Sequence, residues 1–311
     1  MLRVLTASQL LETDPKDLLP GGALYRKPAN VVSFSGGKDS TAMLLMMLER
    51  GEPIADIVFF DGGWEFPQMH DHLKQVEKFI GRTITRLRPR LPVGTVTDKA
   101  PFDWMLSEYP VTKRGTKDIH KIGRGWPAPL RRWCTGFKQD ALKAHLLALT
   151  HREGYALPLR QCIGFAADEL DRLDGATKRD GKFHVQRYPL IEWGVTEHNA
   201  LTYCKERGFT WGGLYRHFDR VSCFCCPLQG LDELRKLRSF FPGLWQRMLE
   251  VESWLPESDK GRRFNHASSV AALDARFAAE DAAYERKLAT EKEAYERDAA
   301  ADGGQDENCP A

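Results

Sequence analysis

A glycine loop between a predicted strand and a predicted helix constrains this chain most. The apolar run from Val31 to Phe34 is typical of a short buried strand, and the run from Thr41 to Arg50 has helical spacing. Between them, residues 35–40 read SGGKDS. Glycines let a ligand approach the backbone, and the N–H groups at a helix start favour negative charge. We therefore predict a phosphate-binding loop, distinct from the Walker pattern GxxxxGK[ST].

Strands and helices alternate after this loop. The spacing of apolar residues predicts strands over 56–60, 83–87 and 161–165, and helices over 66–80, 136–151 and 196–207, the last capped by Thr196. Such alternation is typical of a mostly parallel sheet with helices on its faces. We expect an α/β fold with a doubly wound, mostly parallel sheet and a helical, cysteine-containing C-terminal region. His70 and His72 fall on the helical pattern of 66–80, where we expect both to be exposed and without a role.

The sequence also predicts how the chain is organised. We expect an N-terminal lead over 1–29, a nucleotide-binding α/β domain over 30–220, a cysteine cluster with helices over 221–265, and a long helix with a disordered tail over 266–311. In the third region, paired helices are predicted at 231–241 and 243–254, separated by Pro242. Residues 89–133 are rich in Pro, Gly, Arg and Trp, so we expect loops and short helices there.

Charge and hydropathy narrow the class of protein. No run approaches the roughly 18 apolar residues of a membrane-spanning helix, and Glu12 and Asp14 interrupt any secretory signal. We therefore expect a soluble, cytoplasmic protein without a membrane partner. Residues 82–138 carry 13 Lys and Arg against four acids. This segment suits an anionic partner such as a nucleotide, a sulfate or a nucleic acid, or forms a solvated basic surface.

Six of the seven cysteines fall into two groups, and the seventh, Cys309, lies in the tail. Cys162 and Cys204 lie in apolar patterns and are expected in the core. Disulfides are not expected in a cytoplasmic chain. The remaining candidates lie in polar, aromatic-flanked settings and are typical of metal ligands: Cys134, Cys223, Cys225 and Cys226. Cys223 and Cys226 form a CxxC, a spacing that suits zinc or an iron–sulfur cluster.

Together these segments resemble a known family. The SFSGGKDS segment resembles the PP-loop of the ATP pyrophosphatase, or adenine nucleotide alpha hydrolase-like (HUP), superfamily. Residues 58–67 resemble the segment fDTGwEfP, residues 132–138 resemble RwCt..lK, residues 163–172 resemble iGi..dE..R, and residues 223–227 resemble C..CP. This combination resembles the phosphoadenosine phosphosulfate (PAPS) reductase family over roughly residues 30–250. The resemblance implies a nucleotide-binding α/β fold.

The departures from that family indicate the nucleotide. Reductases of adenylyl sulfates usually have a degraded PP-loop and a tail cysteine in an ECG[IL]H setting. This chain has an intact loop, and its tail cysteine, Cys309, stands in ENCPA. The resemblance therefore implies ATP, cleaved between its α and β phosphates, as in adenylating and thiolating members of the superfamily.

The expected nucleotide site gathers residues from four segments. Lys38 and Asp61 are the candidate catalytic residues. Asp61 follows a predicted strand, where it either holds Mg²⁺ or contacts the nucleotide. Asp168, Glu169 and Arg172 either line the same edge or form a local salt-bridge cluster. The full set expected to bind ATP and Mg²⁺ is Ser35, Gly36, Gly37, Lys38, Asp39, Ser40, Asp61, Arg132, Lys138, Asp168, Glu169 and Arg172.

The cysteines leave several ligand sets open. Cys134 is the expected partner of Cys223 and Cys226, but Trp133 stands where the resembling reductases carry a second adjacent cysteine. Either Cys225 supplies the fourth ligand of a [4Fe-4S] cluster or one iron remains open. A structural zinc ion and free or redox thiols are the alternatives. Trp126 and Trp133 near this site are either packing residues or part of it.

Three functions follow as hypotheses. The first is a PP-loop enzyme that adenylates an acceptor with ATP and supports sulfur transfer at an iron–sulfur cluster, with a sulfur donor protein as a further partner. The second is a thioredoxin-dependent adenylyl-sulfate or phosphoadenylyl-sulfate reductase that uses Cys309. The third is a nucleic-acid-binding subunit of a DNA or RNA sulfur-modification system.

Overall fold

A computed structural model describes residues 18–19, 23–24, 30–128, 131–152, 158–172, 184–221, 223–256, 260–265 and 268–302. The described parts of 1–104 and 131–226 form one compact unit, and those of 105–130 and 227–311 form a second. The domain limits expected from the sequence remain a prediction. Two short strands, β1 (Leu18–Leu19) and β2 (Ala23–Leu24), pair antiparallel within the N-terminal lead.

A five-stranded parallel sheet is the centre of the first unit. Its strands lie in the order β5-β4-β3-β8-β9. They are β3 (Asn30–Ser33), β4 (Ile54–Phe60), β5 (Thr85–Leu87), β8 (Leu159–Ile163) and β9 (His184–Arg187). All four pairings between neighbouring strands are parallel. The α/β fold class and the parallel sheet predicted from the sequence are confirmed.

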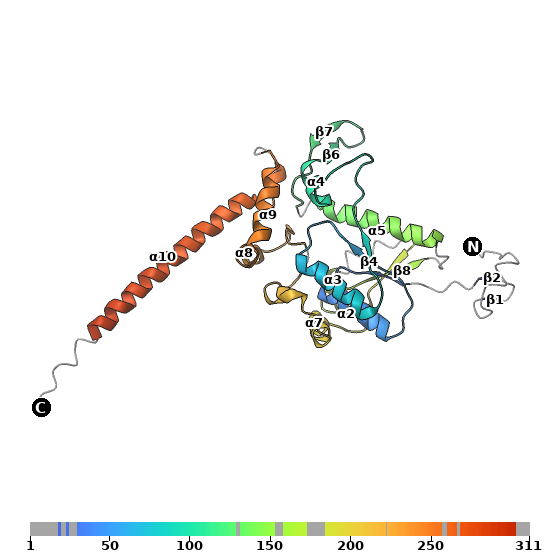
Figure 1. The fold of residues 1–311 in the computed structure, drawn as a ribbon, viewed down its shortest axis with the longest axis horizontal. Helices are drawn as coiled ribbons and strands as arrows, with labels where there is room; N and C mark the ends of the chain where they lie inside the picture. The colour runs from blue at the N-terminus through green and yellow to red at the C-terminus, as the bar shows by residue number, and fades with distance from the viewer. Residues whose placement is uncertain are drawn as a thin grey trace, which may run out of the picture. The chain divides into compact units, whose positions relative to one another are not determined.

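Helices cover both faces of this sheet. On one face, α5 (Trp133–Arg152) packs Leu146 and Leu149 against Val31, Val58 and Leu159 of three strands. On the other lie α2 (Lys38–Glu49) and α3 (Pro67–Ile80), as Figure 1 shows. These helices agree with the apolar spacing of the sequence.

The remaining elements of the first unit follow β8. They are η2 (Leu170–Arg172), α6 (Pro189–Glu192), α7 (Glu197–Glu206) and η4 (Trp211–Arg216). Thr196 caps α7 as predicted, since its Oγ1 accepts a hydrogen bond from the Asn199 N–H at 3.2 Å. Cys162 and Cys204 are fully buried, which confirms their place in the core.

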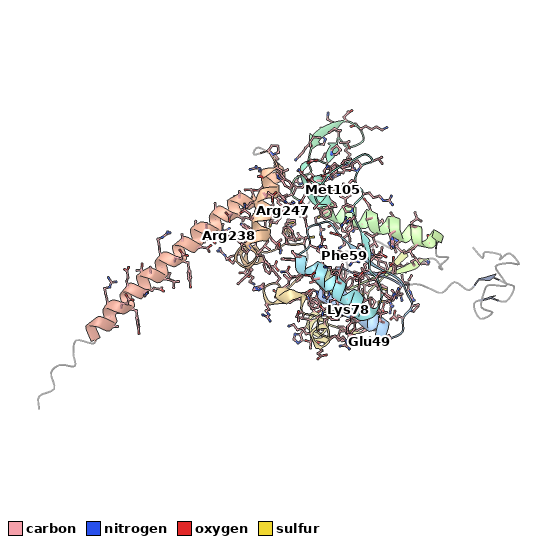
Figure 2. The ribbon with its side chains drawn as sticks, in the orientation of Figure 1. Glu49, Phe59, Lys78, Met105, Arg238 and Arg247 are labelled. Carbon is pink, nitrogen blue, oxygen red and sulfur yellow. The ribbon has the colours of Figure 1, made fainter. Side chains whose placement is uncertain are left out.

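The second unit is mainly helical. It contains α8 (Leu231–Phe240), α9 (Pro242–Ser253), η5 (Lys260–Arg262) and α10 (Val270–Asp302). Within residues 89–133, where loops and short helices were expected, this unit has a hairpin of β6 (Pro110–Thr112) and β7 (Ile119–Ile122). In sequence, α4 (Pro101–Ser107) crosses the limit between the units. Figure 2 labels Arg238 of α8 and Arg247 of α9.

The buried carboxylate of Glu252 joins three elements of the second unit. Its oxygens accept hydrogen bonds from the backbone N–H groups of Val270 at 2.7 Å and Ala271 at 3.0 Å, the first residues of α10. The indole Nε1 of Trp126 donates to the same carboxylate at 3.2 Å. Trp126 is 1% exposed, which favours packing over the alternative that it forms part of the cysteine site. Within the described residues, no helix is long and apolar enough to span a membrane.

Candidate functional site

The order of the strands reverses beside β3. The chain builds β3, β4 and β5 in one direction, then returns to the opposite side of β3 with β8 and β9. Ligands of open parallel sheets bind at such a reversal, beyond the carboxyl ends of the strands. The loop 35–37 follows β3 and the loop 164–169 follows β8. The candidate nucleotide residues of these two loops therefore meet at this reversal.

Two glycines let other elements pack directly against these loops: Gly36 faces α3, and Gly164 faces the start of α2. Gly36 has φ +80°, and a Cβ there would lie 2.3 Å from Met69 Sδ. A Cβ on Gly164 would lie 2.9 Å from the backbone Cα and N of Ser40, in the first turn of α2. Gly164 thus lets the loop after β8 contact the start of α2 directly. The sequence analysis quoted this residue in a motif but gave it no role.

The serine hydroxyls of the loop form a short chain of hydrogen bonds. Ser35 Oγ donates to Ser40 Oγ at 3.0 Å, and Ser40 Oγ donates to the Gly37 carbonyl oxygen at 3.1 Å. Gly37 is the N-cap of α2, so Lys38, Asp39 and Ser40 form its first turn. The first backbone N–H groups of a helix have no intrahelical acceptor and can bind an anion.

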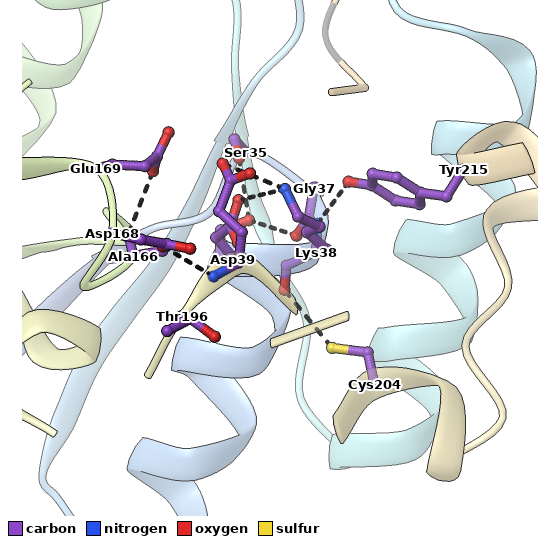
Figure 3. Close-up of polar contacts among 12 residues, drawn as sticks. Ser35, Gly37, Lys38, Asp39, Ala166, Asp168, Glu169, Thr196, Cys204 and Tyr215 are labelled. Carbon is purple, nitrogen blue, oxygen red and sulfur yellow. Dashed lines mark hydrogen bonds and ion pairs between the residues drawn. The ribbon is translucent and has the colours of Figure 1, made fainter. Parts of the chain in front are cut away.

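Lys38 is held by two carboxylates inside the site. It is 4% exposed, and its Nζ lies 3.3 Å from Asp39 Oδ2 and 3.4 Å from Glu197 Oε1. Glu197 is the first residue of α7, and its N–H donates to Asp168 Oδ1 at 3.0 Å. Figure 3 shows Asp168, which follows β8, near Asp39 of α2. Glu197 is a residue that the sequence analysis missed.

Three carboxylates converge beside Lys38. Single oxygens of Asp39, Glu169 and Glu197 lie within 4.8 Å of one another. The pKa of Asp39 is raised to about 6: burial is the largest cause, the charges of Glu197 and Glu169 add to it, and Lys38 opposes it. Asp39 Oδ1 is buried and has no hydrogen-bond partner among the described residues. A divalent cation would offset this negative charge and bind that oxygen.

Asp61 lies at the end of β4 in a second acidic loop. Its Oδ1 accepts a hydrogen bond from the Gly63 N–H at 2.9 Å, and its Oδ2 lies 3.4 Å from Arg88 Nη2. Glu65 accepts hydrogen bonds from the N–H groups of Gly63 and Trp64, both at 3.0 Å. Burial raises the pKa of Glu65 to about 7, and the charge of Asp61 adds to this effect. Asp61, Glu65 and His70 form a second convergent group of possible ligands.

The candidate metal-binding cysteines gather beyond Glu65. Cys134 lies in the first turn of α5, while Cys223 forms an isolated bridge with Glu65 and donates a weak hydrogen bond from Sγ to Glu65 Oε1 at 3.9 Å. Burial raises the pKa of Cys223 well above its usual value, and the charges of Cys226 and Cys134 contribute. Burial and the charge of Cys226 also raise the pKa of Cys134. These three thiols therefore face a shared environment.

Cys225 shares Cys223, Cys226 and Glu65 as neighbours and also has Asp103 nearby. It is 1% exposed, and burial raises its pKa well above the usual value, with Cys223 and Asp103 as the next largest contributions. Asp103 accepts a hydrogen bond from Trp64 Nε1 at 2.8 Å. The ring of Trp133 packs edge-on against Trp64, with 5.7 Å between centroids. Trp133 therefore packs in the aromatic wall beside the cysteines.

Several other predicted residues lie outside the phosphate loop. Lys138 acts on Glu65 and Cys223 through its charge, and so belongs with the cysteines. Arg132 is exposed just before α5. Glu169 Oε2 accepts a hydrogen bond from the Ala166 N–H at 3.2 Å. Arg172 ends η2, but its side chain, like Cys309, lies outside what the structure describes.

The expectation that His72 is exposed was wrong. His72 is 2% exposed, its Nε2 lies 3.0 Å from Thr41 Oγ1, and its ring stacks on Trp211 with centroids 4.5 Å apart. Burial lowers the pKa of His72 to about 3, so the ring is neutral and packs inside the unit. His70 is half-buried. The helical pattern placed both residues on α3 but could not show that the segment 209–215 covers one of them.

The loop and the cysteines are close neighbours in this unit. A Cβ on Gly37 would lie 3.7 Å from the carbonyl oxygen of Val221, two residues before Cys223. The family model of the phosphoadenosine phosphosulfate reductase domain matches residues 29–229, more than half of the chain. The chain belongs to this family. As a PAPS reductase-family protein, it is a member of the PP-loop, adenine nucleotide alpha hydrolase-like superfamily.

Two curated relatives extend the comparison. The uncharacterized protein MJ0066 of Methanocaldococcus jannaschii is 28% identical over 236 residues, which cover 73% of this chain and 42% of the relative. The uncharacterized protein MJ0973 of the same organism is 24% identical over 226 residues, 70% of this chain and 46% of the relative. The chain thus spans less than half the length of each. PAPS reductase-family membership supports a PP-loop enzyme that uses a nucleotide.

Proposed function

We propose that this PAPS reductase-family chain binds ATP, cleaves it between the α and β phosphates, and transfers AMP to an acceptor. The observation that carries the proposal is the intact loop 35–40, folded over the start of α2 beside Gly164. Its backbone N–H groups and Lys38 are suited to the negative charge that develops on departing pyrophosphate. Ser35 and Ser40 offer hydroxyl groups at the same place.

Mg²⁺ fits the three convergent carboxylates. Asp39, Glu169 and Glu197 supply the hard oxygen ligands that Mg²⁺ prefers, and the buried Asp39 Oδ1 is suited to bind it. Both oxygens of Asp61 already accept hydrogen bonds. This favours Asp61 as a residue that shapes its loop and contacts the nucleotide.

The cysteines suit a [4Fe-4S] cluster better than zinc. Tetrahedral zinc with thiolates at about 2.3 Å needs sulfurs roughly 3.8 Å apart. In the described residues, two groups of three side chains converge within 4.8 Å, and neither contains a cysteine. A larger cluster can span Cys134, Cys223 and Cys226, whose half-buried thiols would ionise on binding it. When bound, such a cluster would supply a site for sulfur or electron transfer.

The acceptor in this proposal is an anion. Arg131 and Arg132 are both exposed at the start of α5, close in sequence to Cys134. Arginine binds sulfate and phosphate through paired N–H groups. Sulfate and the phosphate backbone of DNA or RNA are the acceptors that this charge favours, and a sulfur donor protein would complete the reaction.

Labelled ATP tests the nucleotide chemistry. Anaerobically purified protein is incubated with Mg²⁺, ATP and candidate acceptors, and release of pyrophosphate and formation of an AMP adduct are measured. Lys38→Met should lower pyrophosphate release at least about 100-fold, because a charge aimed at the leaving group is lost. Lys78→Met, on the exposed part of α3 (Figure 2), is the control and should retain full activity.

The outcome of this assay separates the candidate functions. Release of ADP and phosphate instead of pyrophosphate would contradict cleavage between the α and β phosphates. Sulfite release from adenylyl sulfate or phosphoadenylyl sulfate, dependent on thioredoxin and lost in Cys309→Ser, would identify a reductase. Salt-sensitive binding of DNA or RNA without turnover would favour a binding subunit.

Iron and sulfide analysis tests the cluster. Cys134→Ser, Cys223→Ser and Cys226→Ser should each lose the brown colour and most of the iron, whereas Cys162→Ser, in the core between strands, should keep both. Loss of iron in Cys225→Ser would identify Cys225 as the fourth cysteine ligand. Retention of iron would indicate that one iron of the cluster has no cysteine ligand. A colourless wild type loaded with zinc would reject the cluster.

A further inference from the structure

The hydroxyl group of Tyr215 lies on the phosphate-binding loop. It accepts a hydrogen bond from the backbone N–H of Lys38 at 2.7 Å. Tyr215 comes from η4, far from Lys38 in the sequence, and Figure 3 shows its ring directed at the loop. A Cβ on Gly37 would lie 3.3 Å from the same hydroxyl oxygen. Tyr215 therefore occupies the position directly in front of the first turn of α2.

This position is one that a phosphate oxygen would take. Lys38 is the first residue of α2, so its N–H has no acceptor within the helix. Such N–H groups are what a helix start offers to a bound phosphate. The Tyr215 oxygen supplies an acceptor at the same place, and thus satisfies the N–H while no nucleotide is bound.

The side chain of Lys38 is engaged at the same time. Its Nζ pairs with Asp39 and Glu197 and lies 5.8 Å from the centroid of the Tyr215 ring. Both the backbone and the side-chain donors of Lys38 are therefore used inside the protein. A phosphate group that enters the loop has to exchange with these partners.

The segment that carries Tyr215 is anchored at its other end. Trp211 Nε1 donates to the Gly36 carbonyl oxygen at 2.7 Å, and Trp211 is stacked on the buried His72. Trp211, Gly212 and Gly213 have φ of 50°, 58° and 85°, a tight left-handed turn between the two aromatic residues. This anchor fixes the backbone of η4 against the loop and leaves the tyrosine side chain as the part that can move.

The tyrosine ring has space to move into. A cavity of about 540 Å³ adjoins it, lined by Lys205, Thr210, Gly212, Gly213, Tyr215 and Arg216. Rotation of the Tyr215 side chain toward this cavity would free the Lys38 N–H without displacing Trp211. Tyr215 is half-buried, and rotamer changes of side chains that reach solvent are fast local motions.

We propose that Tyr215 gates the nucleotide site by standing in for a phosphate oxygen. In the empty loop its hydroxyl accepts the Lys38 N–H; when nucleotide binds, a phosphate oxygen takes over this hydrogen bond and the ring turns toward the cavity. The inference rests on the proposed nucleotide-binding function. It makes Tyr215 a competitor of phosphate, whereas a tyrosine that only braced the loop would help phosphate to bind.

Tyr215→Phe distinguishes a competitor from a brace. The variant keeps the ring and its edge contact with Trp211 but removes the competing acceptor. We expect about 2- to 10-fold tighter binding of ATP and of inorganic pyrophosphate, the effect of one hydrogen bond that no longer has to be exchanged. Binding of adenosine, which has no phosphate, should not change. Tyr295→Phe, on the exposed part of α10, is the matched control.

Calorimetric titration of the full chain with Mg²⁺·ATP, pyrophosphate and adenosine gives the result. Equal or weaker binding of pyrophosphate by folded Tyr215→Phe would overturn the gate while leaving the nucleotide site intact. Absence of ATP and pyrophosphate binding by the wild type would instead remove the proposed function, and the gate with it.

A second measurement needs no variant. Nitration of tyrosines is followed by mass spectrometry in the wild-type chain with and without ATP, with exposed Tyr295 as the internal reference. The gate predicts greater nitration of Tyr215 when ATP is present, because the hydroxyl leaves the loop. Unchanged or lower nitration of Tyr215 on saturation with ATP contradicts the gate.

Discussion

At the residue scale, the candidate site depends on positions where no side chain fits. Gly164 is such a position, because a Cβ would overlap the backbone of Ser40 rather than the end of a flexible side chain. The start of α2 would have to shift to relieve that overlap. The same shift would displace the N–H groups that the proposed function directs at phosphate.

Gly164→Ala should therefore weaken both the fold and the nucleotide site. We expect a loss of about 1–3 kcal/mol in the free energy of unfolding, typical of overpacking, and at least about tenfold weaker ATP binding. Gly136→Ala is the control, since nothing lies within 4 Å of a Cβ there and the residue is inside α5. Denaturant unfolding and titration with ATP measure the two effects; equal behaviour of both variants would contradict this role of Gly164.

Asp56, which lies outside the phosphate loop, makes the free energy of unfolding depend on pH. Burial alone would raise its pKa, but hydrogen bonds from His145, Thr85 and the Ile57 N–H hold the pKa below the usual value. The distance from His145 Nε2 to Asp56 Oδ2 is 2.7 Å. Because the folded-state pKa is depressed, this contribution is present above the unfolded-state pKa and is lost as the pH falls through the folded-state pKa.

Asp56→Asn should remove this dependence. At neutral pH we expect a loss of about 1–3 kcal/mol, since hydrogen bonds to a charged group are lost. The difference in the free energy of unfolding between wild type and variant should shrink below about pH 4. Chemical denaturation of both proteins measures this difference at pH values from about 3 to about 7, a range that includes the usual carboxyl pKa. A difference that stays constant over this range would exclude the ionised carboxylate as the cause.

At the scale of elements, α10 depends on a residue from another helix. Val270, Leu273 and Phe277 are buried, whereas Tyr284 and Tyr295 are 63% and 77% exposed. The long helix expected within 266–311 is found as α10, and most of its C-terminal part is exposed to solvent. Its start is fixed by Glu252, whose carboxylate binds the first N–H groups and complements the positive end of the helix dipole.

Glu252→Gln should loosen the start of α10. The amide keeps the size of the side chain but loses the charge and one acceptor, so we expect a loss of about 1–3 kcal/mol. Hydrogen exchange should rise over residues 270–277 and change little over 285–300, which are already exposed. Glu250→Gln on the same helix, with a half-exposed side chain, is the control. Unchanged protection of 270–277 would show that packing alone holds this end.

At the scale of the whole molecule, the four cysteines proposed to bind a metal cluster belong to the first unit, whereas α8, α9 and α10 belong to the second. Removal of a bound metal should therefore destabilise one unit selectively. Anaerobic chelation should increase hydrogen exchange around residues 223–226 and the start of α5, and leave residues 231–253 protected. The effect should be absent in Cys226→Ser, which lacks the metal from the outset. Equal loss of protection in both units would contradict this assignment.

The sequence was informative where the pattern is local. The loop after β3 and the alternation of strands and helices follow from glycine spacing and apolar periodicity, and both are found in the structure. The strand β9 was missed because HVQR has one apolar residue and its side chains are half-buried; Arg187 of this edge strand pairs with Glu52 and Glu192. No periodicity marks a strand of that kind.

The missed site residues act over long separations. Glu197, Tyr215 and Trp211 contact the loop from segments 159–177 residues away in the sequence. Only the three-dimensional fold brings them there. Glu65 stood inside a quoted motif, and its place between the acidic loop and Cys223 depends on a bridge that no local spacing reveals.

The central place of β3 affects how the site forms during synthesis. This strand is translated before its neighbour β8 and the closing residue Gly164, which follow about 130 residues later. At translation rates of about 5–20 residues per second, the nascent chain holds a half-built loop for about 6–25 seconds. The anion pocket thus matures after its own sequence has been translated, and incomplete chains that end before β8 lack one wall of it.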